Sequence, residues 1–383
     1  MTCYNRCMKR AVLIALTASV IHIFLLLLAY LLIVPRIHYS GFFPYREIAQ
    51  GYHMNQFISS LANFDGVHYL GLAERGYYQF EQAFFPLYPL CIRGLGFLFN
   101  NNLLISGIVV TNIAFVIGFA FLILLFSRME NKTSISALLL YIAFPASYYF
   151  HVVYTEGLFL CFFAGALFFY QRKQWLWAGV FGFFASLTRL FGVLLTILFL
   201  YQAYLMYKRV GWRIFILPLL PLGGFVSYAV FLLITTGDPF AFFHAQSAFA
   251  TRSTHLVLLP QVYYRYLKII FTAQFSFAYA IACLELLIFS VCIVGCVYVF
   301  VKKCKTWKTN PLPTFLAGFS ILSILIPTFT GTLSSIPRYS LFAFSFFIAL
   351  SHLSKRVQFV IIAVSLLCQL ILFSFFLQGY FVS

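Results

Sequence analysis

Long apolar runs separated by short polar breaks extend over most of the chain. Many of them exceed eighteen residues, the length at which an α-helix can cross a bilayer. With the N-terminus on the inner side we predict eleven crossings, of which the short pair 174–187 and 191–207 is open to miscounting. The crossings cover residues 11–34, 103–126, 134–151, 156–171, 174–187, 191–207, 214–234, 278–301, 312–329, 338–353 and 357–377. The pattern predicts an all-α polytopic membrane protein, one domain over residues 1–383.

Two polar segments are predicted on the outer side, residues 35–102 and 235–267. Within the first, residues 50–61 mix apolar and polar positions, as in an amphipathic helix on the membrane surface. Residues 83–99 are apolar but contain Pro86, Pro89 and two glycines, which indicates interfacial or re-entrant structure. We therefore expect the 35–102 loop to carry structure of its own.

Composition and charge agree with a membrane protein rather than a nucleic-acid-binding one. The chain is 63% hydrophobic and 9% charged, with a formal net charge of +17. Its bases occur in short clusters between apolar runs, which is typical of cytoplasmic loops that face anionic lipid. The first run follows three bases and is too long for a signal-peptide core, so it is interpreted as a retained anchor. The nine cysteines form no disulfide or metal pattern.

The acidic residues have the opposite distribution. Of the eight, four fall in the 35–102 loop: Glu47, Asp65, Glu74 and Glu81. Because acidic residues contribute little to membrane topology, this asymmetry requires another cause. A site that uses carboxylates on the outer side would supply one.

Asp65 lies among aromatic residues, on which sugar rings commonly pack. Its carboxylate could accept the proton of a hydroxyl nucleophile. A lone Asp in a loop is also a common turn former or helix N-cap. His68 could bind substrate or orient Asp65, or it could be a packed loop histidine. Glu81 carries the same ambiguity.

This region resembles the PIG-V family, the lipid-linked mannosyltransferases that add the second mannose of GPI anchors, and their prokaryotic relatives. The family pattern runs tryptophan-aspartate, histidine-aromatic, glycine-tyrosine, glutamate and phenylalanine-phenylalanine-proline. The matching residues here are Asp65, His68-Tyr69, Gly76-Tyr77, Glu81 and Phe84-Phe85-Pro86-Leu87-Tyr88-Pro89. Phe64 stands where the family more often has tryptophan, which keeps an aromatic face.

The resemblance continues in order to about residue 350. Thr155-Glu156 is similar to a family segment that opens a transmembrane helix, Thr188-Arg189 to a threonine-arginine pair, and Arg338-Tyr339 to a late arginine-tyrosine pair. These short pairs are individually weak and gain force from their order and spacing.

The resemblance implies a GT-C glycosyltransferase, which uses a polyprenyl- or dolichyl-phosphate sugar. Asp65 would be the catalytic general base for inverting transfer of a hexose, mannose in the family, to a lipid-linked or glycan acceptor. Donor or acceptor binding would involve His68, Tyr69, Glu81, Glu156, Arg189 and Arg338. No cofactor or metal is implied.

The two arginines are expected at outer helix ends, where guanidinium can bind the leaving phosphate. The alternative is snorkelling of a terminal arginine to the interface. Arg252 and Arg265 are further candidates for the phosphate. Glu156 would orient Arg189 or bind a sugar hydroxyl, although an acid that begins a helix is also favoured by the helix dipole. Glu285, inside a crossing, could be functional or packed.

Two other functions are open: a transporter or flippase of lipid-linked sugars, and an envelope polysaccharide polymerase or acyltransferase. Transporters usually carry ionisable groups near the bilayer midplane and internal repeats, and no repeat is apparent here. The short chain favours a prokaryotic plasma membrane over the endoplasmic reticulum.

Overall fold

The computed structural model describes residues 2–129, 134–248, 253 and 255–382, and the ordered elements among them are all helices. Seven helices in these ranges are long and apolar enough to cross a membrane. They are Arg6–Arg36, Leu103–Met129, Leu190–Arg209, Trp212–Thr236, Phe277–Cys304, Pro311–Thr328 and Lys355–Leu377. The chain is an all-helical, multi-pass integral membrane protein, as the apolar pattern predicted.

The chain divides into two compact units, and each is described by itself. The first comprises Met1–Asn131, Tyr148–Phe242 and Phe373–Phe381, and the second comprises Lys132–Ser147, Phe243–Leu372 and Val382–Ser383. A single functional domain over residues 1–383 stays a prediction.

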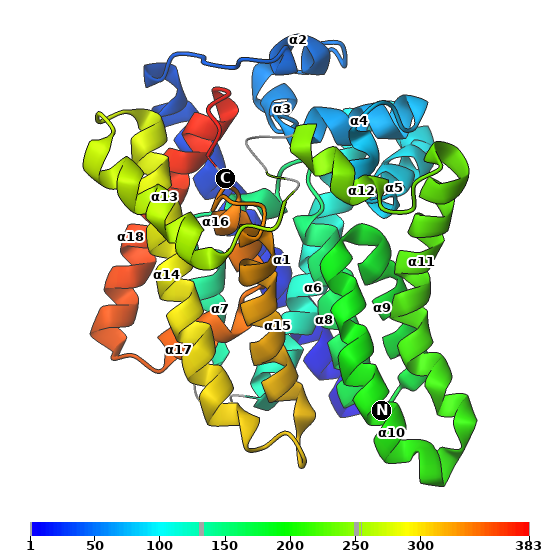
Figure 1. Cartoon of the computed structure of the whole chain (residues 1–383). Coiled ribbons are helices and arrows are strands. Elements are labelled where there is room, and N and C mark those ends of the chain that lie inside the picture. The colour runs from blue at the N-terminus through cyan, green and yellow to red at the C-terminus, as the bar shows by residue number, and fades with distance from the viewer. Residues whose placement is uncertain (1, 130–133, 249–252, 254, 383) are drawn as a thin grey trace. The chain divides into compact units, whose positions relative to one another are not determined.

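The first unit contains most of the predicted site (Figure 1). Its α-helices are α1 (Thr2–Leu32), α2 (Tyr45–Gln50), α3 (Gln56–Ser60), α4 (Asp65–Arg75), α5 (Leu87–Gly96), α6 (Leu103–Met129), α8 (Glu156–Gln171), α9 (Trp175–Thr188), α10 (Leu195–Val210) and α11 (Ile216–Thr236). Its 3-10 turns are η1 (Val34–Arg36), η2 (Glu81–Ala83), η3 (Phe97–Phe99), η4 (Ser147–Phe150, at the edge of the unit), η5 (Leu190–Leu194) and η6 (Trp212–Phe215).

Helix α6 packs closely against α8, and α8 against α9. Two glycines permit the α6–α8 approach. A Cβ atom on Gly118 would lie 2.6 Å from the Cys161 backbone nitrogen, and one on Gly157 would lie 2.5 Å from the Thr111 carbonyl oxygen. Small residues allow such approaches, and close packing drives helix association where the surrounding lipid is itself apolar.

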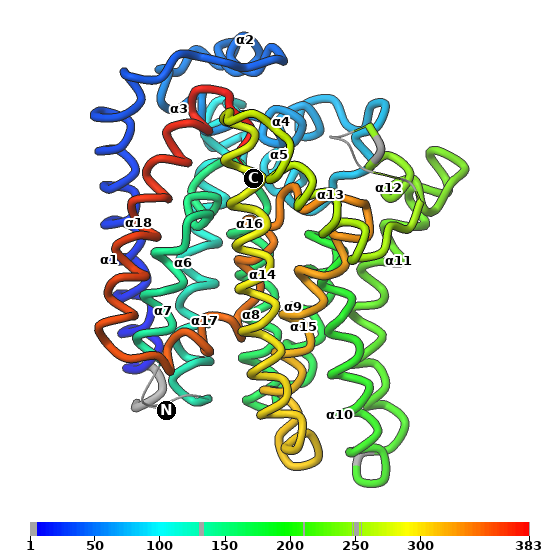
Figure 2. Tube along the Cα trace, turned by 60° about the vertical axis from the view of Figure 1, so that its left-hand side comes forward, coloured from blue at the N-terminus to red at the C-terminus, as the bar shows by residue number. Residues whose placement is uncertain are grey.

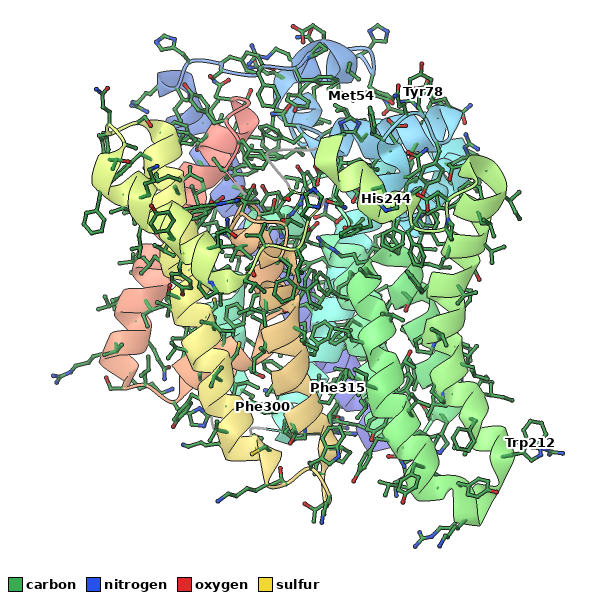
Figure 3. The ribbon with its side chains drawn as sticks, in the orientation of Figure 1. Met54, Tyr78, Trp212, His244, Phe300 and Phe315 are labelled. Atoms are coloured by element: carbon green, nitrogen blue, oxygen red, sulfur yellow. The ribbon has the colours of Figure 1, made fainter. Side chains whose placement is uncertain are left out.

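The two ends of the first unit differ in character. Met54 and Tyr78 lie at the end that carries α2 to α5, whereas Trp212 lies at the opposite end, in the connection between α10 and α11 (Figure 3). The N-terminus lies at the Trp212 end (Figure 1). Lys208 and Arg209 are in the last turn of α10, beside that connection. The N-terminus and this basic connection therefore share one end, as the predicted topology requires.

The second unit contains α7 (Ser134–Ile142), α13 (Leu259–Thr272), α14 (Phe277–Cys304), α15 (Pro311–Thr328), α16 (Ile336–Tyr339), η8 (Ser340–Phe342), α17 (Phe344–Ser351) and most of α18 (Lys355–Leu377). Helix α14 packs on α15 and α17, and α17 packs on α7 (Figure 2). The division between the units falls within the short α12 (Ala241–His244), and η7 (Ala245–Ala248) follows it in the second unit.

The count of eleven crossings is not confirmed, because two predicted spans are interrupted. Across residues 134–151, helix α7 ends at Ile142, and Pro145 follows, which lacks a backbone N–H and disfavours helix in the residue before it. Across residues 338–353, Ala343 has ψ 58° and separates η8 from α17. Helices α8 and α9 are continuous but short.

The single amphipathic helix expected over residues 50–61 is wrong. Helix α2 ends at Gln50, and α3 begins only at Gln56. The Asn55 side chain accepts a hydrogen bond from the Ile58 backbone N–H and caps α3. An asparagine that satisfies a free backbone donor starts a new helix and does not continue an old one.

Candidate functional site

Asp65 is the first residue of α4, and Phe64 occupies the N-cap position before it. The carboxylate therefore lies in the first helical turn, where the helix dipole favours negative charge. Two phenols lie within its electrostatic reach. Burial and then the charge of Asp65 raise the pKa of Tyr45 and of Tyr69, so both stay protonated near neutral pH.

Tyr69 connects Asp65 to a second group of residues. After burial and Asp65, the groups that affect the pKa of Tyr69 are Arg189, which lowers it, and Glu156, which raises it. Thr155 is a hydrogen-bond partner of the same phenol. Charged groups at the start of α4, the start of α8 and the end of α9 thus all influence one tyrosine.

Glu156 and Arg189 form a buried ion pair. The Arg189 Nη1 atom donates to Oε1 of Glu156 at 2.6 Å. Glu156 is fully buried, and the Arg189 side chain is 12% exposed. Glu156 begins α8, whereas Arg189 terminates α9 with extended backbone. Acid at a helix start and base at a helix end are both favoured by the helix dipole. The ion pair brings together the two residues for which the sequence suggested a joint role. Binding of a donor or of a sugar hydroxyl by them stays a prediction.

Glu81 is held by a different partner. The Arg75 guanidinium donates to both of its carboxylate oxygens, at 2.7 and 2.8 Å, and the Tyr78 backbone N–H donates to it at 3.0 Å. Burial raises the pKa of Glu81, but hydrogen bonds with His68, Arg75 and Tyr78 outweigh burial and lower the pKa to about 2. Glu81 thereby closes the turn between α4 and η2. A role for it in substrate binding stays a prediction.

His68 and Tyr69 pack on the aromatic motif that follows η2. The His68 ring stacks on Phe84 with centroids 5.3 Å apart, and its Nδ1 lies 3.5 Å from Glu81. Tyr69 contacts Phe84 edge-on at 5.0 Å and Tyr88 at 5.1 Å. Phe84 thus packs against both residues.

Arg338 belongs to the second unit, whereas the six other predicted site residues belong to the first. It lies in the short α16 and is 7% exposed, with its guanidinium carbon 5.8 Å from the Tyr339 ring centroid. Of the other phosphate candidates, Arg265 donates to the Gly331 carbonyl oxygen, and Arg252 lies outside the described residues.

Glu285 is buried in α14, and the Tyr266 hydroxyl donates to it at 2.6 Å. Tyr266 also accepts from the Leu333 backbone N–H at 2.9 Å. These bonds tie α13 and α14 to the loop before α16, so Glu285 takes part in the packing of the second unit. A functional role for it stays a prediction.

No group of three or more His, Cys, Asp or Glu side chains that could hold a metal occurs in the part of the chain that the structure covers. Comparison with protein-family models, curated proteins and solved structures finds no match. Function is therefore inferred from the residues around Tyr69.

Sequence reasoning assigned no role to Arg75 or Tyr45. Arg75 and Glu81 are six residues apart across a turn, a spacing that no helical pairing rule selects. Tyr45 lies twenty positions before Asp65, in another helix, and only the folded loop brings the two together.

Proposed function

We propose that this protein is a membrane glycosyltransferase that moves a hexose, mannose in the first instance, from a polyprenyl- or dolichyl-phosphate donor to an acceptor hydroxyl. The acceptor is a lipid-linked sugar or another glycan. The observation that carries the proposal is the buried Glu156–Arg189 ion pair, whose charges act on the Tyr69 phenol together with the Asp65 carboxylate. A proton acceptor and a fixed guanidinium are the two charges that this reaction requires.

The proposed step is a single displacement with inversion. The acceptor oxygen forms a bond to the anomeric carbon while the bond from that carbon to the donor phosphate oxygen breaks. The acceptor proton passes to Asp65, and the electron pair leaves with the phosphate, which gains one negative charge. Phosphate leaves as an anion without an acid.

Arg189 would bind the charge that develops on the phosphate. A guanidinium carries five N–H donors, so Arg189 can contact phosphate while it remains paired with Glu156. The pair also keeps the cation in place before the donor arrives, because a buried charge is costly without a partner. Arg338 would contribute a second cation, as the family resemblance implies.

We further propose the finer architecture that the resemblance implies: a GT-C-like bundle of about eleven crossings in a prokaryotic plasma membrane. The 35–102 loop and its site would face away from the cytoplasm. The basic α10–α11 connection, at the end of the first unit opposite α2 to α5, supports this orientation.

The test is transfer of radiolabelled mannose from polyprenyl-phosphate mannose to a membrane extract by the purified protein in lipid vesicles. Wild-type protein is expected to label a product with an α-linkage, and Asp65→Asn protein is not. Absence of transfer by wild-type protein with both polyprenyl and dolichyl donors would contradict the proposal.

A second candidate is transport of a lipid-linked sugar, which buried ionisable groups inside the spanning helices favour. Two such buried groups are Glu285 in α14 and His22 in α1. The Nδ1 atom of His22 lies 2.9 Å from Nε2 of His151. Movement of the labelled lipid between leaflets of the same vesicles, with no new glycosidic bond, would select transport.

A further inference from the structure

We infer that Tyr154 is a positioning residue for Asp65 and that the C-terminal strap, residues 376–381, holds the two residues that precede Asp65. The inference rests on the proposed function, in which Asp65 is the base. Its central observation is a hydroxyl bridge: the Asp65 backbone N–H donates to the Tyr154 hydroxyl at 3.2 Å, and this hydroxyl donates to the Asn63 carbonyl at 3.2 Å.

The residue inside this bridge has an unusual backbone. Phe64 has φ 57° and ψ −119°, a conformation that L residues rarely adopt and glycine adopts readily. Its buried ring is enclosed by Tyr45 at 4.9 Å and by Phe376 and Phe381, each at 5.6 Å between centroids. Tertiary packing therefore imposes the turn that sets the direction in which α4 begins at Asp65.

The strap binds the residue on the other side of Phe64. The Asn63 amide donates to the carbonyl oxygens of Phe376 and Leu377, at 2.9 and 3.2 Å. These carbonyls are at the end of α18, where a helix leaves its last acceptors without internal partners. Asn63 thus caps a helix that lies more than three hundred residues later in the chain.

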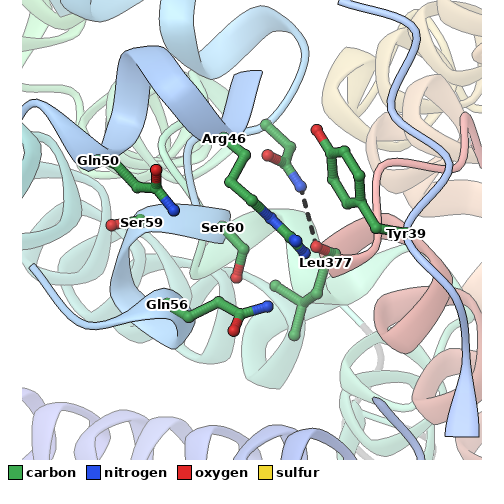
Figure 4. A pocket seen from close by; sticks show the side chains of 8 residues that line it. Tyr39, Arg46, Gln50, Gln56, Ser59, Ser60 and Leu377 are labelled. Carbon is green, nitrogen blue, oxygen red and sulfur yellow. Dashed lines mark hydrogen bonds between the residues drawn. The ribbon is translucent and has the colours of Figure 1, made fainter. Parts of the chain in front are cut away.

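Gln378 fixes the strap to the loop after α1. Its amide nitrogen donates to the Val34 and Ile37 carbonyls, at 3.1 and 2.9 Å, and its amide oxygen accepts from Arg46 at 3.1 Å. Arg46 also stacks on Tyr39, with 3.9 Å to the ring centroid (Figure 4). The strap is therefore anchored through Gln378 to the loop after α1. It also contacts Asn63 and Phe64, the two residues before Asp65.

This arrangement has a kinetic consequence. A carboxylate at the start of a helix takes its direction from the backbone of the preceding residues, and displacements of about 1 Å in an active site can cost about 100-fold in rate. Loss of the Tyr154 hydroxyl would leave the Asp65 N–H and the Asn63 carbonyl without their shared partner. The base would then be present but misdirected, which lowers kcat more than it changes the donor KM.

The first experiment compares Tyr154→Phe with wild type in the transfer assay. We expect kcat to fall by about 10- to 100-fold with little change in donor KM. The matched control is Tyr170→Phe, which removes the hydroxyl of another buried tyrosine of the same unit, one that donates to Gln202 at 2.8 Å. The control is expected to keep wild-type kcat. Equal kcat values for Tyr154→Phe and Tyr170→Phe would overturn the inference.

The second experiment needs no transferase activity. Residue 65 is changed to cysteine (Asp65→Cys) with and without Tyr154→Phe, and the rate of labelling at position 65 by a methanethiosulfonate reagent is followed by peptide mass spectrometry. A several-fold change in rate supports positioning by Tyr154, and equal rates overturn it. If labelling changes but wild-type protein transfers no sugar, the proposed function fails and the positioning stands. If Asp65→Asn abolishes transfer and Tyr154→Phe keeps the wild-type kcat, only the positioning fails.

Discussion

Oε1 of Glu156 lies 2.6 Å from Nη1 of Arg189, although 33 residues separate them in the chain. The pair joins the first residue of α8 to the residue that ends α9. Tyr69, from α4, lies within the field of both charges and of Asp65. The proposed function depends on these three charged groups at helix ends. The following predictions test them separately.

Asp65→Asn should lower the rate of transfer by about 10²- to 10⁴-fold, because the amide cannot accept the acceptor proton. Stability should change little, since the carboxylate follows the N-cap and its interaction with the dipole contributes only about 0.3–1 kcal/mol. Asp65→Glu should recover little activity because the longer side chain displaces the oxygens.

The control for Asp65 is Glu47→Gln, which removes an exposed acid from the first turn of α2 in the same loop. It should transfer sugar at the wild-type rate. Near-wild-type transfer by a well-inserted Asp65→Asn protein would remove Asp65 from the mechanism and leave it a dipole-stabilising residue.

Arg189→Gln should raise the donor KM and destabilise the protein, because Glu156 would remain as a buried charge without its partner. Breaking a buried ion pair in this way costs about 3–5 kcal/mol. Arg189→Lys should rescue only in part, since an ammonium cannot bind two oxygens in the planar geometry of guanidinium. Donor KM and thermal unfolding in detergent measure the two effects.

Glu156→Gln/Arg189→Gln isolates the catalytic effect of Arg189, because it leaves no buried charge. It should regain stability relative to Arg189→Gln and still bind donor poorly. Arg128→Gln, an exposed position in the last turn of α6, is the matched control. An unchanged donor KM in the double variant would show that Arg189 stabilises the fold and does not bind the donor.

The clamp between Glu81 and Arg75 should make stability depend on pH at the acidic end. The pKa of Glu81 is lowered from 4.5 to about 2, so the ionised form is favoured by the folded protein. Its contribution to stability should be complete above pH 4.5 and decline as the pH falls toward 2.

Glu81→Gln should therefore cost on the order of 1–3 kcal/mol at pH 7, and the difference from wild type should shrink between pH 4.5 and 2. Thermal unfolding at a series of pH values measures this. Glu74→Gln, at an exposed position of α4 beside Arg75, should show no such trend. A constant difference between wild type and Glu81→Gln across this range would show that the carboxylate is not held in its ionised form.

The orientation of the first unit can be tested with two cysteines at its opposite ends. Gln79→Cys adjoins Tyr78, and Trp212→Cys lies in the α10–α11 connection (Figure 3). A membrane-impermeant thiol reagent should label position 79 in intact cells and position 212 only after lysis. The reverse pattern would place the Asp65 region on the cytoplasmic side and remove the lipid-phosphate donor from the proposal.

Much of the secondary structure was predictable because it depends on local features. Apolar length identified the long helices, and the start of α8 at Glu156 and the end of α9 at Thr188 agree with the sequence interpretation within a residue or two. The errors occurred where a single residue interrupts an apolar or amphipathic run. Asn55 starts a new helix, and Ala343 breaks a predicted span, which hydrophobicity alone does not reveal.

The sequence by itself determined that the chain is helical and membrane-embedded, that half of its acids lie in the 35–102 loop, and which residues are candidates for the site. The tertiary structure decided how these residues are paired: Glu156 with Arg189, Glu81 with Arg75, and Asp65 with Tyr154. It also brought Gln378 and the C-terminal strap to the loop after α1. Helix formation follows from hydrogen bonds within a few residues, so a local pattern can signal it. Contacts between helix ends depend on how whole helices pack, and no periodicity along the chain encodes which partner each side chain meets.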